Sequence, residues 1–240
     1  MEIDPLIVTN GISSLIVSII SFVIGVKLAI KYYRRKERTL ILVGLTWLIM
    51  YEGWWGPSVS FLLLVLTNHP LPIELFFIIS MSLIPLGITF WMIVFTDLKW
   101  QKYQKAVTII FTIQIPIYEI LSFYYLFTDS SSIVVSVGVI DAQYKSFIIF
   151  FFIEIAILLI ITGYFFAKES LKLEKRDMRL KGIFLLVGFI SLVIGATLDV
   201  FLELEIVTLI IYRLILVFSS FIFYFGFFLP KSIKLILKRS

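Results

Sequence analysis

The chain has 240 residues, of which 60% are hydrophobic, and it carries a formal net charge of +5. Soluble domains of this size do not have such a composition, whereas polytopic membrane proteins do. There is no cysteine and a single histidine, His69, so disulfides, thiol chemistry and a metal site built from histidines are excluded. The sequence has no Ser-His pair, phosphate-binding glycine loop or paired-histidine motif, so neither an enzyme nor a cofactor is expected.

Seven apolar spans follow one another along the chain. Each is long enough for a helix to cross a hydrocarbon core of about 30 Å, which takes about 20 residues, and none alternates as a barrel strand does. We therefore predict an all-α fold, a bundle of seven transmembrane helices that forms one domain over residues 1–240. The predicted spans are 6–30, 40–66, 73–96, 106–127, 146–167, 182–202 and 206–229.

The connections between the spans alternate in charge. The N-terminus and the second, fourth and sixth connections are neutral or acidic, with Lys145 as their one basic residue. Because basic loops remain on the cytoplasmic side, this pattern predicts the N-terminus outside and the C-terminus inside, in agreement with an odd number of spans. The basic residues of the predicted inner side are Lys31, Arg34, Arg35, Lys36, Arg38, Lys99, Lys102, Lys105, Lys168, Lys172, Lys175, Arg176, Arg179, Lys181, Lys231, Lys234, Lys238 and Arg239.

The span 40–66 carries the sequence EGWWGP at its centre. Glu52 then lies near the middle of the bilayer, where an ionisable group costs at least about 2.5 kcal/mol and is expected to have a role or a partner. Pro57 lacks the N–H that would bond to the carbonyl of Gly53, so a kink is expected there. Trp54 and Trp55 lie too deep for an interfacial belt and are expected to pack or to line a pocket.

Small residues recur every three or four positions on the first and sixth spans. Such faces allow two helices in lipid to approach closely, which is their simplest explanation. The alternative is that these faces slide during a conformational change. The residues concerned are Gly11, Ser14, Ser18, Ser21 and Gly25 in the first span, and Gly188, Ser191, Gly195 and Asp199 in the sixth.

Five ionisable residues, four acids and one arginine, lie inside the spans. Arg213 is expected to pair with Asp199 first and with Glu154 second. One arginine cannot neutralise four acids. The others are therefore either protonated or hydrogen-bonded structural groups, or they line an outward-facing polar pocket for a small-molecule or cation ligand. The candidate pocket residues are Glu52, Trp54, Trp55, Glu119, Glu154, Asp199 and Arg213.

Two stretches carry a resemblance to known proteins. The run RRKER followed by LTWLIMYEG resembles the second helix of the seven-helix sensor region at the N-terminus of some archaeal and bacterial histidine kinases. The TW…WW.P…SF pattern and the FYFGFFLP ending are similar to seven-transmembrane proteins of Asgard-type archaea. The matching residues are Trp47, Tyr51, Glu52 and the WWGP run. These 240 residues hold no kinase module, so the resemblance implies a sensor that signals through a cytoplasmic partner at its basic inner loops.

Two functions of different classes therefore fit the sequence. The first is a receptor or sensor of the plasma membrane that passes a shift to the inner loops through the kinked second helix. The second is a small ion-coupled transporter that uses Glu52 as a mid-membrane site. A sensor pocket opens to one side, whereas a carrier must expose Glu52 to both sides in turn.

Overall fold

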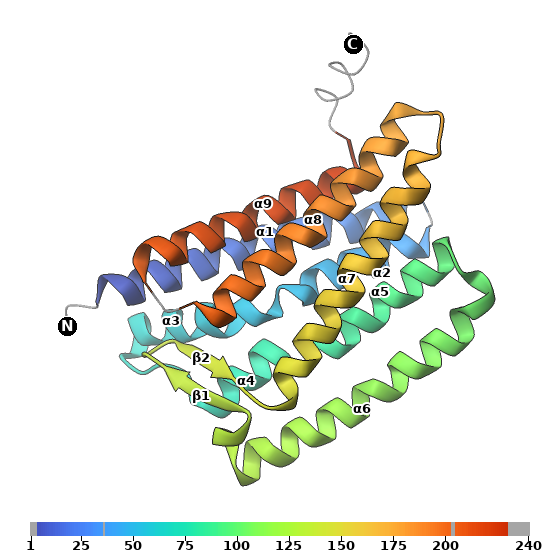
Figure 1. Cartoon of the computed structure of the whole chain (residues 1–240). Coiled ribbons are helices and arrows are strands. Elements are labelled where there is room, and N and C mark those ends of the chain that lie inside the picture. The colour runs from blue at the N-terminus through green and yellow to red at the C-terminus, as the bar shows by residue number, and fades with distance from the viewer. Residues whose placement is uncertain (1–3, 36, 203–204, 230–240) are drawn as a thin grey trace. The chain divides into compact units, whose positions relative to one another are not determined.

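The structure is a computed structural model, and it describes residues 4–35, 37–202 and 205–229 (Figure 1). The side chains of residues 32–36 are also outside the description. Several residues used in the topology prediction therefore lie outside the described part: Glu2, Arg34, Arg35, Lys36, Glu203, Lys231, Lys234, Lys238 and Arg239.

All seven predicted spans are helical, and within the described residues seven helical segments are long and apolar enough to cross a membrane. This agrees with an integral membrane protein, and the placement of the termini outside and inside stays a prediction. Four spans each form a single helix: α1 (Pro5–Arg35), α7 (Phe147–Leu171), α8 (Arg176–Phe201) and α9 (Ile206–Phe227). The fourth span in the chain is α6 (Gln104–Thr128), which follows a short 3-10 helix, η2 (Gln101–Tyr103).

The second and third spans are each interrupted. The second consists of α2 (Arg38–Met50), the 3-10 helix η1 (Glu52–Trp54) and α3 (Trp55–Thr67), and the third consists of α4 (Ile73–Met81) and α5 (Ile84–Leu98). The predicted kink at Pro57 was therefore misplaced: the helix breaks before this proline and restarts with Pro57 in the first turn of α3. Pro85 likewise lies in the first turn of α5. A first turn accepts proline because the N–H that proline lacks has no intrahelical partner there.

The connection between α6 and α7 contains regular structure that the sequence analysis did not predict. It begins with η3 (Ser130–Ser132) and forms an antiparallel hairpin of β1 (Val134–Val137) and β2 (Asp141–Tyr144), in which Val134 is opposite Tyr144 and Val137 is opposite Asp141. Gly138 begins the turn with φ +67°, a conformation that costs glycine little. Valine-rich alternation beside a glycine is typical of a hairpin, and the apolar spans on either side hid this short signal.

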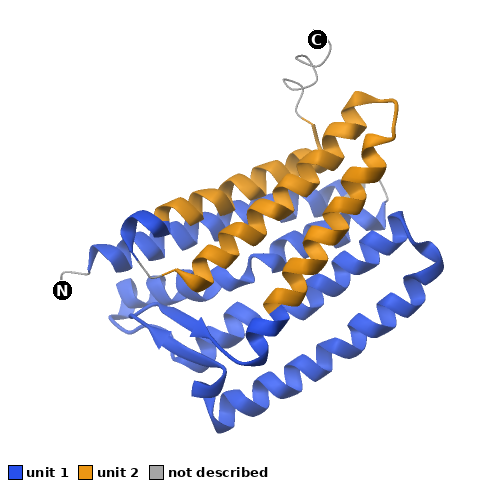
Figure 2. Cartoon of the chain, viewed as in Figure 1, with its two compact units in different colours: residues 1–151, 204–209 blue, residues 152–203, 210–240 orange. Residues whose placement is uncertain are grey.

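The chain divides into two compact units (Figure 2). Unit 1 comprises residues 1–151 and 204–209, and unit 2 comprises residues 152–203 and 210–240. Unit 1 therefore holds α1 to α6 and the hairpin, and unit 2 holds most of α7, α8 and α9.

Within unit 1 the small residues of α1 are contact points. A Cβ on Gly44 of α2 would lie 2.5 Å from the carbonyl oxygen of Gly25, and a Cβ on Gly11 would lie 2.0 Å from the ring of Phe61 in α3. The backbones approach too closely for larger residues. The packing explanation of this stripe is thus confirmed for Gly11 and Gly25.

The same holds for α8 and α9 in unit 2. A Cβ on Gly188 would lie 3.1 Å from the backbone nitrogen of Phe223, and one on Gly195 would lie 2.8 Å from the side chain of Leu216. The hydroxyl of Ser219 donates a hydrogen bond to the carbonyl of Gly188 over 2.9 Å. The small residues of the sixth span thus serve close packing against the seventh.

Candidate functional site

Glu52 lies at the interruption of the second span and binds the interruption of the third. Its side chain is buried, with 1% of the residue's surface exposed. The backbone N–H of Leu83 donates to both carboxyl oxygens, at N–O distances of 3.0 and 2.8 Å, and the hydroxyl of Ser82 donates to one of them over 3.4 Å. The sequence analysis expected a role or a partner for this carboxyl; it has a partner, and the partner is a helix end.

The bond to Leu83 caps α5. Leu83 is the residue that precedes the first turn of this helix. An N–H in this position has no carbonyl acceptor within the helix. In a capping box a Glu in the first turn of the same helix fills this position. Here the Glu comes from a neighbouring span, and its carboxyl group also lies at the positive end of the α5 dipole. Glu52 thus satisfies a backbone donor that lipid could not satisfy.

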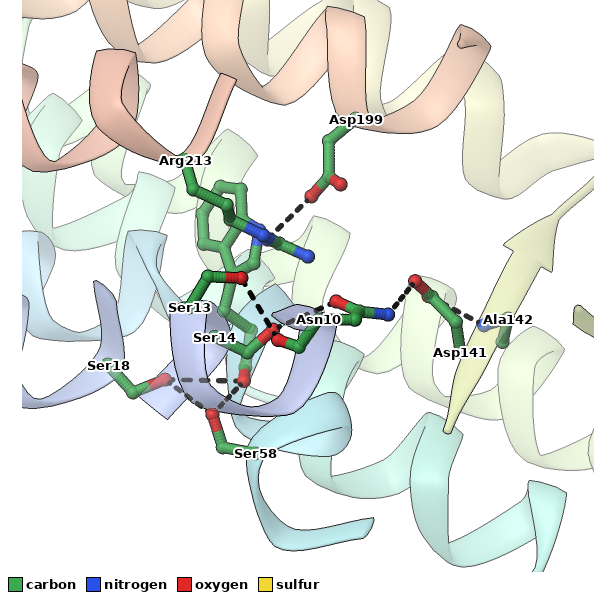
Figure 3. A network of polar contacts seen from close by, with 10 residues as sticks. Asn10, Ser13, Ser14, Ser18, Ser58, Asp141, Ala142, Asp199 and Arg213 are labelled. Atoms are coloured by element: carbon green, nitrogen blue, oxygen red, sulfur yellow. Dashed lines mark hydrogen bonds and ion pairs between the residues drawn. The ribbon is translucent and has the colours of Figure 1, made fainter. Parts of the chain in front are cut away.

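The interruption around η1 leaves the carbonyl of Trp54 as an acceptor. The hydroxyl of Ser58 donates to it over 2.6 Å and that of Ser18 over 3.2 Å, and the two hydroxyls lie 3.0 Å apart (Figure 3). Ser18 belongs to α1 and Ser58 to α3, so these bonds fasten the break to the first span. The sequence analysis placed Ser18 on a packing face but did not predict this polar role.

The tryptophans of the EGWWGP motif have different surroundings. The ring of Trp54 is buried and lies 5.3 Å from that of Tyr51, which in turn lies 5.0 Å from the ring of Trp47. Trp55 is half-buried. Tilted aromatic contacts of this kind add about 0.5–1.5 kcal/mol beyond burial of the rings. They give Trp54 a packing role, and a ligand contact for either residue stays a prediction.

Arg213 and Asp199 form an ion pair within unit 2. Nη1 of Arg213 on α9 lies 2.9 Å from Oδ2 of Asp199 on α8, and the two side chains are 4% and 16% exposed (Figure 3). The predicted first choice of partner for Arg213 is confirmed. A pair this deeply buried holds α8 against α9 because separating the charges would leave one of them unpaired.

The remaining two acids belong to different units. Glu119 lies half-buried on α6 in unit 1, close enough to Glu52 for an electrostatic interaction between the two side chains. Glu154 lies half-buried on α7 in unit 2. The structure therefore brings Asp199 to Arg213 and Glu119 near Glu52. A single pocket lined by all the candidate residues stays a prediction.

The hairpin is fastened to the first span by a residue that the sequence analysis missed. Nδ2 of Asn10 donates to Oδ2 of Asp141 over 2.8 Å, and Oδ1 of Asn10 accepts from the hydroxyl of Ser14 over 3.3 Å (Figure 3). Asn10 is buried. Ile140 of the hairpin turn belongs to an apolar cluster with Phe61. An amide among apolar residues was the available signal, and its distance in sequence from Asp141 concealed the pairing.

Polar groups also join α2, α5 and α6 at their predicted inner ends. Nη2 of Arg38 donates to both carboxyl oxygens of Asp97, over 2.9 and 3.0 Å, and Gln104 donates to the same carboxylate. The sequence analysis placed Arg38 in an inner connection without predicting this pairing. Because Arg38 is largely exposed, the pair positions the helix ends more than it stabilises them.

Comparison with protein-family models, curated proteins and solved structures gives no match to this chain. The resemblance to histidine-kinase sensor regions and to archaeal seven-transmembrane proteins stays a prediction from the sequence.

Proposed function

We propose that this protein is an integral membrane receptor or sensor of the plasma membrane, and that it signals through a cytoplasmic partner. The observation that carries the proposal is the bond of Glu52 to Leu83, which joins the interruptions of two adjacent spans. Interrupted helices bend at their breaks more easily than continuous ones do. A bond between two breaks makes them move together.

The interruptions divide part of unit 1 into two packed pairs of half-helices. In the α2–α5 pair, a Cβ on Gly87 would lie 2.6 Å from the side chain of Ile49. In the α3–α4 pair, a Cβ on Gly56 would lie 2.0 Å from the hydroxyl of Ser80. The continuous helix α1 contacts both pairs. Each pair is thus packed tightly enough to move as a body, with Glu52 at the junction.

A ligand that shifts the α3–α4 pair would change the position of the α2–α5 pair. The predicted inner end of α2–α5 is tied to α6 through Arg38, Asp97 and Gln104. A tilt at the junction would therefore reach the basic inner connections, where a cytoplasmic partner would bind. By this route the second span would pass a shift to the inner loops, as the sequence analysis expects.

The ion-coupled transporter remains the second candidate, and a specific observation favours it. Transporters often place interrupted helices around a charged group near the bilayer midplane. Glu52 and its two interruptions have this arrangement. Against this candidate, both carboxyl oxygens of Glu52 already accept the N–H of Leu83, so the carboxylate acts here as a fastening between helices.

Two measurements on the full chain separate the candidates. The purified protein is reconstituted in liposomes that contain a pH-sensitive dye, and proton flux is followed with and without a sodium gradient. A sensor gives no flux above protein-free liposomes. Flux that disappears in Glu52→Gln, while the variant still folds, would refute the sensor proposal and support the transporter.

The second measurement tests the junction. Because the natural chain has no cysteine, two cysteines introduced at exposed Leu66 of α3 and exposed Leu98 of α5 can carry spin labels without background. We expect Glu52→Gln to broaden or shift the distance distribution between the labels. The control is the same labelled protein with Ser82→Ala instead of Glu52→Gln. This substitution should change the distance distribution little. An unchanged distribution in Glu52→Gln would contradict coupling through this carboxylate.

A further inference from the structure

Two hydroxyl groups lie on the buried face of α6. Tyr118 and Ser122 stand one helical turn apart, and 4% and 2% of their surfaces are exposed. The ring of Tyr118 packs against Phe147 and Phe151, with ring centroids 6.0 and 4.5 Å away. Elsewhere α6 exposes isoleucine, leucine and phenylalanine side chains, as a lipid-facing helix does.

Neither hydroxyl has a hydrogen-bond partner among the described residues. The two lie near each other, but without the geometry of a hydrogen bond. A buried hydroxyl left in this way costs about 1–3 kcal/mol, and two on one helix face are not expected in a dry apolar contact. Polar groups of this kind mark internal places that water or a ligand fills.

Two acidic side chains belong to the same place. Glu119 follows Tyr118 directly on α6, and Glu52 is close enough to interact electrostatically with both residues. Within the described residues neither carboxylate is paired with a basic side chain. When carboxyl groups in a low-dielectric interior are ionised, they attract a compensating cation far more strongly than they would in water.

We propose that Tyr118, Ser122 and Glu119 line an internal hydrated site in unit 1 that binds a small monovalent cation, with Glu52 close by. The hydroxyls and the Glu119 carboxylate supply oxygen ligands, while Glu52 keeps its bonds to Leu83. A single available carboxylate suits a monovalent ion better than Ca²⁺, which takes six to eight oxygens and usually several carboxylates. The inference goes beyond the sensor proposal and does not depend on movement at the junction.

The test uses a single cysteine at Ser122 in the full chain, in lipid nanodiscs. Ser122→Cys is treated with equal concentrations of a cationic aminoethyl and an anionic sulfonatoethyl methanethiosulfonate. We expect the cationic reagent to react at least about tenfold faster, after correction for the rates of both with a free thiol. Leu126→Cys is the matched control: it lies one turn further on the same buried face, and it should react at less than about a tenth of the Ser122→Cys rate.

The charge preference should fall in Ser122→Cys combined with Glu119→Gln and persist with Glu154→Gln. Modification of Ser122→Cys no faster than that of Leu126→Cys would overturn the hydrated site. Equal rates for the two reagents would overturn the cation preference. Neither result bears on movement at the Glu52 junction. The outcome of this test is therefore independent of the sensor proposal.

A second variant keeps the inference testable if Ser122→Cys does not fold. Tyr118→Phe removes a hydroxyl without changing the ring. If the contact is dry, removing an unpartnered hydroxyl should raise the melting temperature. If the site is hydrated and binds a cation, the same change should leave the melting temperature unchanged or lower it. Replacing choline chloride by sodium chloride at equal ionic strength should raise the melting temperature of the natural chain and raise it less in Tyr118→Phe. Tyr124→Phe, on the exposed face, is the control.

Discussion

Replacing Glu52 tests whether the capping bond to α5 holds the two interrupted spans together. Glu52→Met keeps a side chain of similar size but offers no acceptor, so the N–H of Leu83 loses its partner. Glu52→Gln keeps one carbonyl acceptor and loses the charge. Ser82→Ala removes the weaker donor at 3.4 Å and leaves the cap in place.

The expected magnitudes follow from these contacts. Leaving the N–H of Leu83 without an acceptor costs about 1–3 kcal/mol, and more where the acceptor that is removed is charged. A carboxylate at a partly buried helix N-terminus contributes up to about 2 kcal/mol when it is ionised. These two effects overlap here because the same carboxylate produces both. We expect a loss in the free energy of unfolding of about 3 kcal/mol for Glu52→Met, about 1 kcal/mol for Glu52→Gln and under about 1 kcal/mol for Ser82→Ala.

The assay is unfolding by sodium dodecyl sulfate in mixed micelles, followed by far-ultraviolet circular dichroism. Reversibility is checked by refolding each variant after dilution of the detergent. The order of the three losses matters more than their size. A Glu52→Met variant as stable as the natural chain, or a Ser82→Ala loss larger than that of Glu52→Gln, would refute the capping role of Glu52.

Three further predictions follow from other contacts. Arg213→Leu should lower the free energy of unfolding by about 3–5 kcal/mol, and Asp199→Asn added to it should recover part of the loss; equal losses in the single and double variants would contradict the pairing. Gly44→Ala should cost about 1–3 kcal/mol in the same assay because its Cβ meets a carbonyl oxygen at 2.5 Å, whereas Gly53→Ala, with its nearest contact at 3.8 Å, should cost less. A cysteine at Lys175 should not react with an impermeant thiol reagent in intact cells and should react once the cells are permeabilised, whereas labelling in intact cells would reverse the predicted topology.

The apolar spans were predictable because a helix in lipid needs a long run of apolar residues. Their interruptions were harder to place. Pro57 and Pro85 signalled a disturbance, but proline begins a half-helix as readily as it kinks a whole one, so the break appeared at Glu52–Trp54. The depth expected for Glu52 indicated a role or a partner, and the carboxyl has a partner. The identity of the partner, the N–H of Leu83, depends on how two spans pack together. The periodicity of the sequence does not predict this packing.

The charged residues show the same limit. Asp199 and Arg213 lie fourteen positions apart near the ends of adjacent spans, so the sequence could suggest that they meet. Closeness in the sequence does not predict the pairing of β1 with β2 or the bond of Asn10 to Asp141. Short strands give weak signals, and a single amide in an apolar helix does not identify its partner.

The bond between Asn10 and Asp141 also bears on how the chain is assembled during its synthesis. The two residues are 131 positions apart. At translation rates of about 5–20 residues per second, Asp141 is synthesised roughly 7–26 s after Asn10. Four spans enter the membrane during that interval, while the amide of the first helix is still without its carboxylate. The first helix can pack on α2 and α3 as soon as these are made, but the amide near its N-terminal end gains this hydrogen bond only once the hairpin has been made.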